Sequence, residues 1–226
     1  MAVQQIKLVK NILVGNDQLA EHNRQRFQAA GVLAINVMAS PGAGKTSFIT
    51  RTMAELGERV RVGVIEGDIA GRIDADKVLA AGAADVVQIN TGGNCHLEAN
   101  MIQTALDQFH LNELDIVFVE NVGNLVCPTH WSLGENLRVC VLSTPEGHDK
   151  PVKYPEIFAT SEVVILNKID LMQMVDFDRD FFYESLQALN PNVVTFEVSC
   201  RTGEGFATWR DWLQAQLAAV KSDAGR

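Results

Sequence analysis

The chain has 226 residues, of which 47% are hydrophobic and 21% charged, and its formal net charge is −9. These values are typical of a globular protein with one large domain, and the negative charge argues against a dedicated nucleic-acid surface. No apolar run is long enough to cross a membrane, and the first residues lack the apolar core of a secretory signal. We therefore expect a cytoplasmic protein with no membrane or nucleic-acid partner, whose four cysteines are thiols rather than disulfides.

A leader precedes the first predicted strand. Residues 1–15 are expected to be extended, and Asn16 or Asp17 can cap a helix that closes at Gly31. Beyond it, short apolar runs rich in β-branched residues alternate with helical patterns. Strands are predicted at residues 32–38, 60–65, 85–89, 115–119, 137–142, 162–166 and 193–198. Helices are predicted from about Lys45, Asp74 and His96, at 176–189 and at 206–220.

This alternation predicts an α/β fold in which a mostly parallel sheet has helices on both faces. The main domain is predicted to cover residues 31–220, after a leader and helix at 1–30 and before a tail at 221–226 that is expected to be mobile. Ligands bind such sheets at the carboxyl ends of the strands. Each of the motifs described below follows a predicted strand.

The first motif is a glycine-rich loop between the strand at 32–38 and the helix from Lys45. Strand, glycine-rich turn and helix start are the context of a P-loop, whose backbone amides close around phosphate oxygens. Lys45 is expected to reach the β- and γ-phosphates and the Thr46 hydroxyl to hold Mg²⁺. The usual pattern opens with Gly, and this chain has Ala39 there. The predicted phosphate-binding residues are Gly42, Ala43, Gly44, Lys45, Thr46 and Ser47.

A second motif, Asn167-Lys168-Ile-Asp170, follows the strand at 162–166 and is similar to the guanine-binding motif of GTPases. A carboxylate such as Asp170 can accept both the N1–H and the 2-amino group of guanine, a donor pair that adenine lacks. Asn167 is expected to brace the loop or touch the base, and the Lys168 stem to lie along the ring. After the strand at 193–198, Ser199-Cys200 resembles a further GTPase loop, whose backbone amides would meet the guanine oxygen. The predicted nucleotide is therefore GTP.

Carboxylates at two other strand ends are candidates for Mg²⁺ and the γ-phosphate. Glu120 and Gly123 resemble the Asp-x-x-Gly switch of GTPases with Glu in place of Asp, so Glu120 is expected near Mg²⁺ and the Gly123 N–H near the γ-phosphate. Asp68 can contact Mg²⁺ or orient the attacking water, and its alternative role is that of a turn or helix-cap residue. No glutamine occupies an obvious water-positioning place, so unaided hydrolysis is expected to be slow.

Cys95 and His96 follow the strand at 85–89, and Cys127 lies just beyond the switch segment. Two thiolates and an imidazole suit Zn²⁺ or Ni²⁺, and three ligands leave one position open. Spacing alone leaves a second interpretation open, in which Cys95 and Cys127 are unrelated loop thiols. His130 is a candidate fourth ligand, although a histidine so placed is more often an ordinary loop residue. Cys140 lies in an apolar strand pattern and is expected in the core.

Six stretches occur in one order and together resemble the HypB family, the GTPases that help to insert nickel into nickel–iron hydrogenase. They lie at residues 40–46, 66–68, 91–97, 120–128, 146–155 and 167–170. The resemblance covers about residues 30–215 and implies a SIMIBI-type P-loop GTPase domain. It also implies a homodimer promoted by GTP, a metal held at the dimer interface by Cys95, His96 and Cys127, and HypA as a partner. The hydrogenase large-subunit precursor would be an indirect partner.

The departures from this family are small. Ala39 stands in the P-loop, Glu98 where Asp is frequent, and Arg201 where Lys is usual. Some members carry a cysteine-rich nickel site or a histidine run near the N-terminus, and this chain has neither, so only the metal site of the GTPase domain is expected. Lys153 has two interpretations: it reaches a phosphate, of its own subunit or of a second one, or it is a solvated lysine.

Three other functions are weighed against this one. The urease accessory GTPase UreG has a Cys-Pro-His triplet in its metal loop, which Cys127-Pro-Thr-His130 interrupts. A P-loop kinase acting on a small molecule would leave the motif at residues 167–170 unexplained. A metal store that uses nucleotide only to dimerise predicts no turnover above background.

Overall fold

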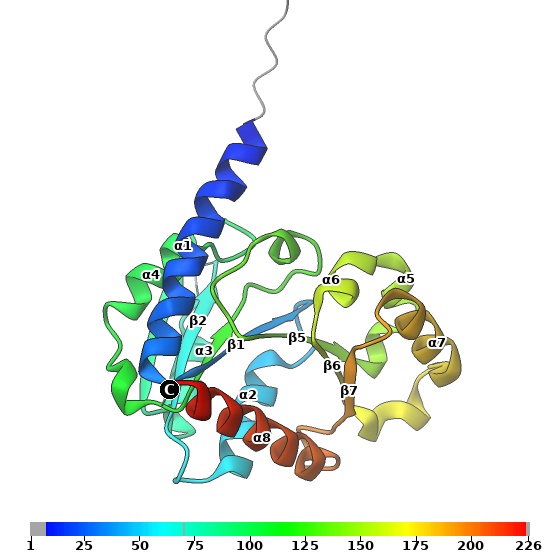
Figure 1. Ribbon diagram of the computed structural model, residues 1–226. Helices are drawn as coiled ribbons and strands as arrows, with labels where there is room; N and C mark the ends of the chain where they lie inside the picture. The colour runs from blue at the N-terminus through cyan, green and yellow to red at the C-terminus, as the bar shows by residue number, and fades with distance from the viewer. Residues whose placement is uncertain (1–7, 70, 225–226) are drawn as a thin grey trace, which may run out of the picture.

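Seven parallel strands form the centre of the computed structural model, which describes residues 8–69 and 71–224 (Figure 1). The strands lie in the order β3-β2-β4-β1-β5-β6-β7. Their bounds are β1 Leu33–Ala39, β2 Val62–Asp68, β3 Asp85–Asn90, β4 Ile116–Glu120, β5 Leu137–Ser143, β6 Val163–Asn167 and β7 Val194–Glu197. The predicted parallel sheet is confirmed, and the largest difference is that β2 continues to Asp68 instead of ending at Ile65.

The strand order reverses at β1, which lies between β4 and β5. Ile35 is the register partner of Phe118 on one side and of Leu137 on the other. At such a switch point the loops that leave neighbouring strands run in opposite directions, and a crevice opens at the carboxyl ends. The glycine-rich loop leaves β1 at this crevice.

Helices cover both faces of the sheet, as the sequence predicts (Figure 1). The α-helices are α1 Leu8–Ala30, α2 Lys45–Leu56, α3 Ile73–Ala80, α4 Ala99–Leu106, α5 Lys150–Lys153, α6 Pro155–Thr160, α7 Arg179–Leu189 and α8 Phe206–Ala224. Short 3-10 helices are η1 Leu111–Glu113, η2 Cys127–His130, η3 Thr144–Glu146 and η4 Ile169–Met174.

Three apolar clusters hold the layers together. Side chains of α2 and α8, such as Phe48 and Trp209, pack on one face of the sheet. On the other face, α1 and α4 contribute Phe27 and Ile102, while α6 and α7 form a separate cluster that includes the buried Cys140. Strand residues alternate between the faces, because successive side chains of a strand point in opposite directions. The position predicted for Cys140 is confirmed.

Three predicted segments differ from the structure. Residues 8–15 are helical rather than extended, because α1 begins at Leu8; residues 1–7 lie outside the described part of the chain. The stretch after Asp149, where no helix is predicted, forms the short helices α5 and α6, each with a proline in its first turn. The last helix continues to Ala224, so residues 221–224 of the expected tail are helical, and residues 225–226 are not described.

Asn16 is an interior residue of α1 and not its cap. Its buried amide donates to the Ser132 carbonyl (2.8 Å) and accepts from the Ala99 N–H (2.9 Å). Asn23, two turns later, donates to the carbonyls of Ala99 and Leu133. The interior position of Asn16 could not be predicted from the sequence, because its hydrogen-bond partners come from segments that are distant along the chain. These bonds fix α1 to the start of α4.

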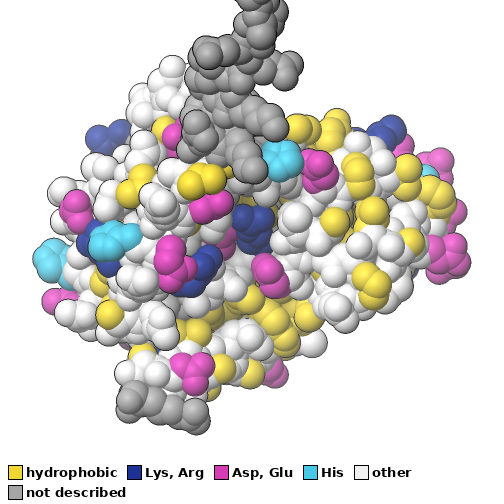
Figure 2. All heavy atoms as spheres, turned by 45° about the horizontal axis from the view of Figure 1, so that its top comes forward, with side chains coloured by type: hydrophobic (Ala, Val, Ile, Leu, Met, Phe, Trp, Pro, Cys, Tyr) yellow, Lys and Arg dark blue, Asp and Glu magenta, His cyan; other side chains and the backbone are white. Residues whose placement is uncertain are grey.

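The surface is charged but mixed in sign. On the face shown in Figure 2, acidic side chains are scattered, and basic side chains gather in a recess near its centre. Within the ranges that the structure describes, no helix is both long and apolar enough to cross a bilayer.

Candidate nucleotide and metal site

The glycine-rich loop connects β1 to α2 at the switch point. Gly42 and Gly44 adopt φ angles of 80° and 104°, which side chains other than hydrogen rarely allow. A Cβ on Gly44 would lie 2.6 Å from Asn167 Nδ2, so the backbone also passes too close to β6 for a larger residue. No side chain caps the start of α2 at Lys45. The first amides of this helix are therefore available to an anion.

A cavity of about 590 Å³ opens in front of this loop. It brings together the residues predicted for phosphate and Mg²⁺ from the ends of β1, β2 and β4. Its lining includes Gly42, Gly44, Lys45, Thr46, Ser47, Asp68, Glu120 and Gly123. Ala43 is buried behind the loop, where its carbonyl accepts from Asn167 Nδ2 (3.0 Å). Asp74, Lys77 and Lys168 also line the cavity.

The acidic side of the cavity fits a divalent cation. Thr46 Oγ1 donates to Glu120 Oε1 (2.8 Å), while the buried Glu120 Oε2 has no hydrogen-bond partner among the residues that the structure describes. Burial raises the pKa of Glu120 to about 7, although Lys45 opposes the shift. Asp68 lies at the same edge and accepts from the Gly71 N–H (2.6 Å), so it also fills the turn role given as its alternative. An ion held by Thr46, Asp68 and Glu120 would satisfy the unpartnered oxygen.

Glu66 is a buried carboxylate that the sequence interpretation did not select. It is the register partner of Glu120 on the neighbouring strand, and only 2% of its surface is exposed. Burial raises its pKa to about 8, with further contributions from Glu120 and Asp68. With Asp68 and Asp74 it forms a group whose carboxylate oxygens lie within 4.8 Å of one another. The alternation of β2 could have indicated Glu66, since a charged residue inside a buried strand is unusual.

A second cavity, of about 300 Å³, adjoins the first and shares Gly44, Ser47 and Lys168 with it. Its other lining residues are Asn167, Asp170, Leu171, Cys200 and Arg201. The carboxylate of Asp170 accepts from Ser199 Oγ (2.6 Å) and so has a fixed orientation. The predicted guanine residues therefore meet beside the phosphate cavity, which is the arrangement that one nucleotide requires.

Asn167 braces three loops rather than standing free. In addition to its bond to Ala43, its Oδ1 accepts from the backbone N–H groups of Lys168 (2.7 Å) and Cys200 (3.3 Å). Lys168 has a φ of 61° and donates from Nζ to the Gly42 carbonyl (2.7 Å), so its stem bridges the two cavities. Burial raises the pKa of the Cys200 thiol to about 11, which keeps it neutral.

The three predicted transition-metal ligands also come together. Cys95 Sγ lies 2.8 Å from Cys127 Sγ and 3.8 Å from His96 Nδ1, although the two cysteines come from different loops. The loop after β3 carries Cys95 and His96, and η2 begins at Cys127. Ligand atoms of all three residues lie within 4.8 Å of one another. The two cysteines are therefore neighbours in space, as a shared metal site requires.

The surroundings of this triad favour a neutral imidazole. Burial lowers the pKa of His96, whose ring stacks on Trp131 with centroids 4.6 Å apart. Glu98 Oε1 lies 3.6 Å from His96 Nε2 and partly offsets the shift. The hydrogen bond with Cys127, together with burial, raises the pKa of the Cys95 thiol. The site therefore holds a neutral imidazole and a protonated thiol that must lose its proton to bind a metal.

Two candidate residues lie apart from these groups. His130 Nε2 pairs with Glu156 Oε2 at 3.1 Å and does not belong to the triad. Lys153, at the end of α5, pairs with Asp149, which precedes this helix, and among the described residues it lines neither nucleotide cavity. Glu146, by contrast, was not selected although it accepts from Ser40 Oγ at the start of the P-loop and from the Ser143 N–H (2.8 Å). Glu146 could have been selected because it is the first residue of the family-like stretch at 146–155.

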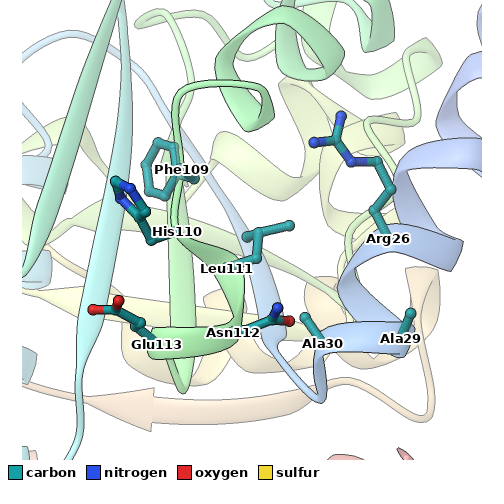
Figure 3. Close-up of a pocket in the computed structure, with 8 residues that line it drawn as sticks. All are labelled: Arg26, Ala29, Ala30, Phe109, His110, Leu111, Asn112 and Glu113. Carbon is teal, nitrogen blue, oxygen red and sulfur yellow. The ribbon is translucent and has the colours of Figure 1, made fainter.

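A further cavity, of about 540 Å³, lies between α1 and the segment around η1, near the amino ends of the strands (Figure 3). Its walls include Arg26, Phe109 and His110. None of the predicted nucleotide or metal residues lines it. The residues predicted for nucleotide and metal lie instead at the carboxyl ends of the strands.

Comparison with known proteins gives one consistent result. Residues 33–197 match the family model described as CobW/HypB/UreG, nucleotide-binding domain. The chain is 44% identical over 219 residues to the hydrogenase maturation factor HypB of Rhizobium leguminosarum bv. viciae. The matched region covers 96% of this chain and 73% of that protein.

Two solved structures extend the similarity to the fold. HypB from Archaeoglobus fulgidus has a TM-score of 0.84 and 37% identity, covering 90% of this chain and 99% of that one. HypB from Helicobacter pylori, solved in complex with nickel, has a TM-score of 0.86 and 34% identity, covering 91% and 96%. The predicted P-loop NTPase fold of the SIMIBI type is thereby confirmed. The chain belongs to the HypB family of hydrogenase maturation factors, within the CobW/HypB/UreG group of nucleotide-binding GTPases.

Proposed function

We propose that this protein hydrolyses GTP and uses the nucleotide to control nickel held by Cys95, His96 and Cys127 during maturation of nickel–iron hydrogenase. One observation carries the proposal: the segment from Glu120 to Cys127 begins in the nucleotide cavity and ends at the thiol pair. A change at the phosphate therefore has only a short path to the metal ligands. The nickel complex of the Helicobacter pylori relative supports nickel as the cargo.

Nucleotide binding follows from the two adjoining cavities. The loop amides and Lys45 receive the phosphates, and Asp170 accepts the paired donors of guanine. Mg²⁺ held by Thr46, Asp68 and Glu120 supplies positive charge that offsets the charge of the β- and γ-phosphates. Gly123 lines the phosphate cavity, and its N–H would sense the terminal phosphate. Ser47, Lys168 and the Ser199–Cys200 backbone complete the site.

Hydrolysis needs a water aligned with the γ-phosphate. Asp68 lies in the phosphate cavity and can orient that water. Among the residues that line this cavity there is no glutamine, the usual water-positioning residue. Unaided turnover is accordingly slow, and a partner or dimerisation would accelerate it.

The metal ligands offered by one protomer are two thiolates and an imidazole. Three ligands leave a position for water or for a group of a second protomer, and such an open site suits an ion that must be released. A GTP-promoted homodimer that pairs through the surface around these ligands would bring two such sites together at the dimer interface. Zn²⁺ fits the same donors, and competition between the ions is part of the test.

The further partners follow from the family. A HypA-type accessory protein exchanges nickel with this chain in the cytoplasm, and the hydrogenase large-subunit precursor receives it indirectly. Lys153 lies on an exposed helix and remains a candidate for contact with the nucleotide of a second protomer.

Thin-layer analysis of GTP labelled in the γ-phosphate tests the reaction. Release of inorganic phosphate, slow but above background and abolished in Lys45→Ala, is expected. Transfer of the label to another molecule would indicate a kinase instead. Label that stays in GTP throughout a long incubation, with dimerisation intact, would indicate a nucleotide-dependent metal store.

A further inference from the structure

Asn124 contacts the backbone of both cysteines of the metal triad. Its Nδ2 donates to the Cys95 carbonyl (3.4 Å), which lies 29 residues away in the sequence. Its Oδ1 accepts from the N–H groups of Val126 (2.8 Å) and Cys127 (3.4 Å). One side chain therefore joins the two loops that supply the thiols.

The backbone of the same residue is fixed to the P-loop. The Asn124 N–H donates to the carbonyl of Ala39, the last residue of β1 (2.8 Å). The preceding Gly123 lies so close to the loop that a Cβ there would come 3.0 Å from Pro41 Cγ and 3.1 Å from Pro41 N. A displacement of Gly123 by a terminal phosphate would therefore move Asn124 with it, because little free space separates the two segments.

A second asparagine in this segment bonds the residue that follows the third ligand, His96. Asn121 is 1% exposed, and its Oδ1 accepts from the N–H of Leu97 (3.1 Å), the residue after His96. Its own N–H donates to the Val37 carbonyl (3.0 Å), and its Nδ2 to Asn36 Oδ1 (3.2 Å) inside β1. The backbones of Cys95 and Cys127, and that of Leu97 next to His96, are thus connected to β1 and its P-loop through Asn124 and Asn121.

We propose that Asn124 is the positioning residue that transmits nucleotide state to the metal site, by holding the Cys95 and Cys127 loops to the segment that follows Gly123. The inference rests on the proposed function and names its transmitting group. A turn-forming asparagine needs only its bonds to Val126 and Cys127. The bond to the distant Cys95 loop is additional, and it makes the separation of the two thiols depend on where Asn124 lies.

The test compares wild type with two variants. Asn124→Ala removes both the Nδ2 donor and the Oδ1 acceptor of the side chain. Asn124→Asp keeps the acceptor but loses the donor to the Cys95 carbonyl. Asn100→Ala is the matched control, because Asn100 is exposed and its side-chain oxygen accepts from the neighbouring Met101 N–H, outside the metal loops. For each protein the nickel Kd is measured with GDP and with a non-hydrolysable GTP analogue, and the ratio of the two values is the coupling. A residue that only stabilises the metal loop would shift both values and leave the ratio unchanged.

Wild type and Asn100→Ala are expected to show the same ratio, about fivefold or more. In Asn124→Ala the ratio is expected to fall toward one, while nickel and the GTP analogue each still bind. An Asn124→Ala protein with the wild-type ratio overturns the inference and leaves the proposed function intact. A wild-type ratio of one overturns both. If Asn124→Ala lacks the helical circular dichroism of wild type, Asn124→Asp takes its place, and retention of the wild-type ratio there overturns the inference.

Discussion

The thiol of Cys95 lies 2.8 Å from that of Cys127, although 32 residues separate them in the chain. One cysteine follows β3, which is an edge strand, and the other follows β4, two strands away in the sheet order. The carboxyl ends of parallel strands meet at one edge, and the loops after these strands converge there. The same edge holds the P-loop, so the metal ligands and the nucleotide cavity are neighbours by topology.

Nickel affinity is expected to rise with pH. The pKa of Cys95 lies above the ordinary thiol value because of its bond to Cys127 and its burial, so the thiol is protonated at pH 7 and must release its proton on binding. For each proton released, the apparent affinity rises about tenfold per pH unit. We expect at least this slope between pH 6 and 8.

Calorimetry in buffers of different ionisation enthalpy counts the protons directly. Release of at least one proton per nickel at pH 7 agrees with the structure. An affinity that does not change with pH would show that the thiols are not the ligands.

Glu66→Gln is expected to stabilise the nucleotide-free protein at high pH. The folded pKa of Glu66 is raised from 4.5 to about 8, so its protonated form contributes stability that is fully present below pH 4.5 and lost as pH rises through 8. The glutamine carries no charge to bury. The Tm advantage of the variant should therefore grow from pH 5 to pH 9, by about 3 °C or more.

Exposed Glu58→Gln is the control and should follow the wild-type profile. Parallel Tm profiles for wild type and Glu66→Gln, followed by circular dichroism, would contradict the burial of an ionisable Glu66.

Gly44→Ala is expected to destabilise the protein more than Gly42→Ala. Both glycines have positive φ angles, so both substitutions strain the backbone. Only the new Cβ at position 44 meets Asn167 Nδ2, at 2.6 Å, whereas position 42 is open. The clash should cost about 1 to 2 kcal/mol more in urea unfolding without nucleotide. Equal losses would mean that Asn167 moves aside freely.

Asp170→Asn tests the nucleotide base. The amide of asparagine cannot accept both donors of guanine, so the GTP affinity should fall about 100-fold. Xanthine has a carbonyl oxygen in place of the 2-amino group, and the new Nδ2 can donate to it, so XTP should bind better to the variant than to wild type. Titration of fluorescent nucleotides measures both changes, with the exposed Asp176→Asn as control. Undiminished GTP binding would remove Asp170 from the base site.

The sheet and the nucleotide loops could be predicted because their signals are local. Continuous apolar runs indicate buried parallel strands, and glycines at a strand-to-helix junction indicate a P-loop. The start of α1 was not predicted, because residues 8–14 form a short, mostly apolar run whose pattern does not separate a helix from an extended segment. Asparagine is a frequent N-cap residue, but Asn16 lies inside the helix. Its side chain bonds Ser132 and Ala99, which are far from it in the sequence.

The metal triad was predictable only in part. Cys95 and His96 are adjacent and Cys127 is distant, so spacing did not decide between a site and unrelated thiols. The strand order supplies what spacing lacks, since it brings both loops to one edge of the sheet and the two thiols together. Glu66 and Asn124 were missed for the same reason. Both residues matter through contacts with segments that are distant in the sequence. The local sequence pattern around a Glu or an Asn does not predict such contacts.

Metal binding by wild type and by Cys95→Ala/Cys127→Ala, with GDP and with a non-hydrolysable GTP analogue, tests the central claim most directly. Nickel and zinc titrations are followed together with light scattering, which reports dimerisation in the same samples. His130→Ala is the control, because His130 pairs with Glu156 outside the triad. The account predicts that wild type and control bind metal with an affinity that depends on the nucleotide, and that the double variant loses at least 100-fold. Equal metal binding by wild type and double variant would contradict it and leave only a GTPase.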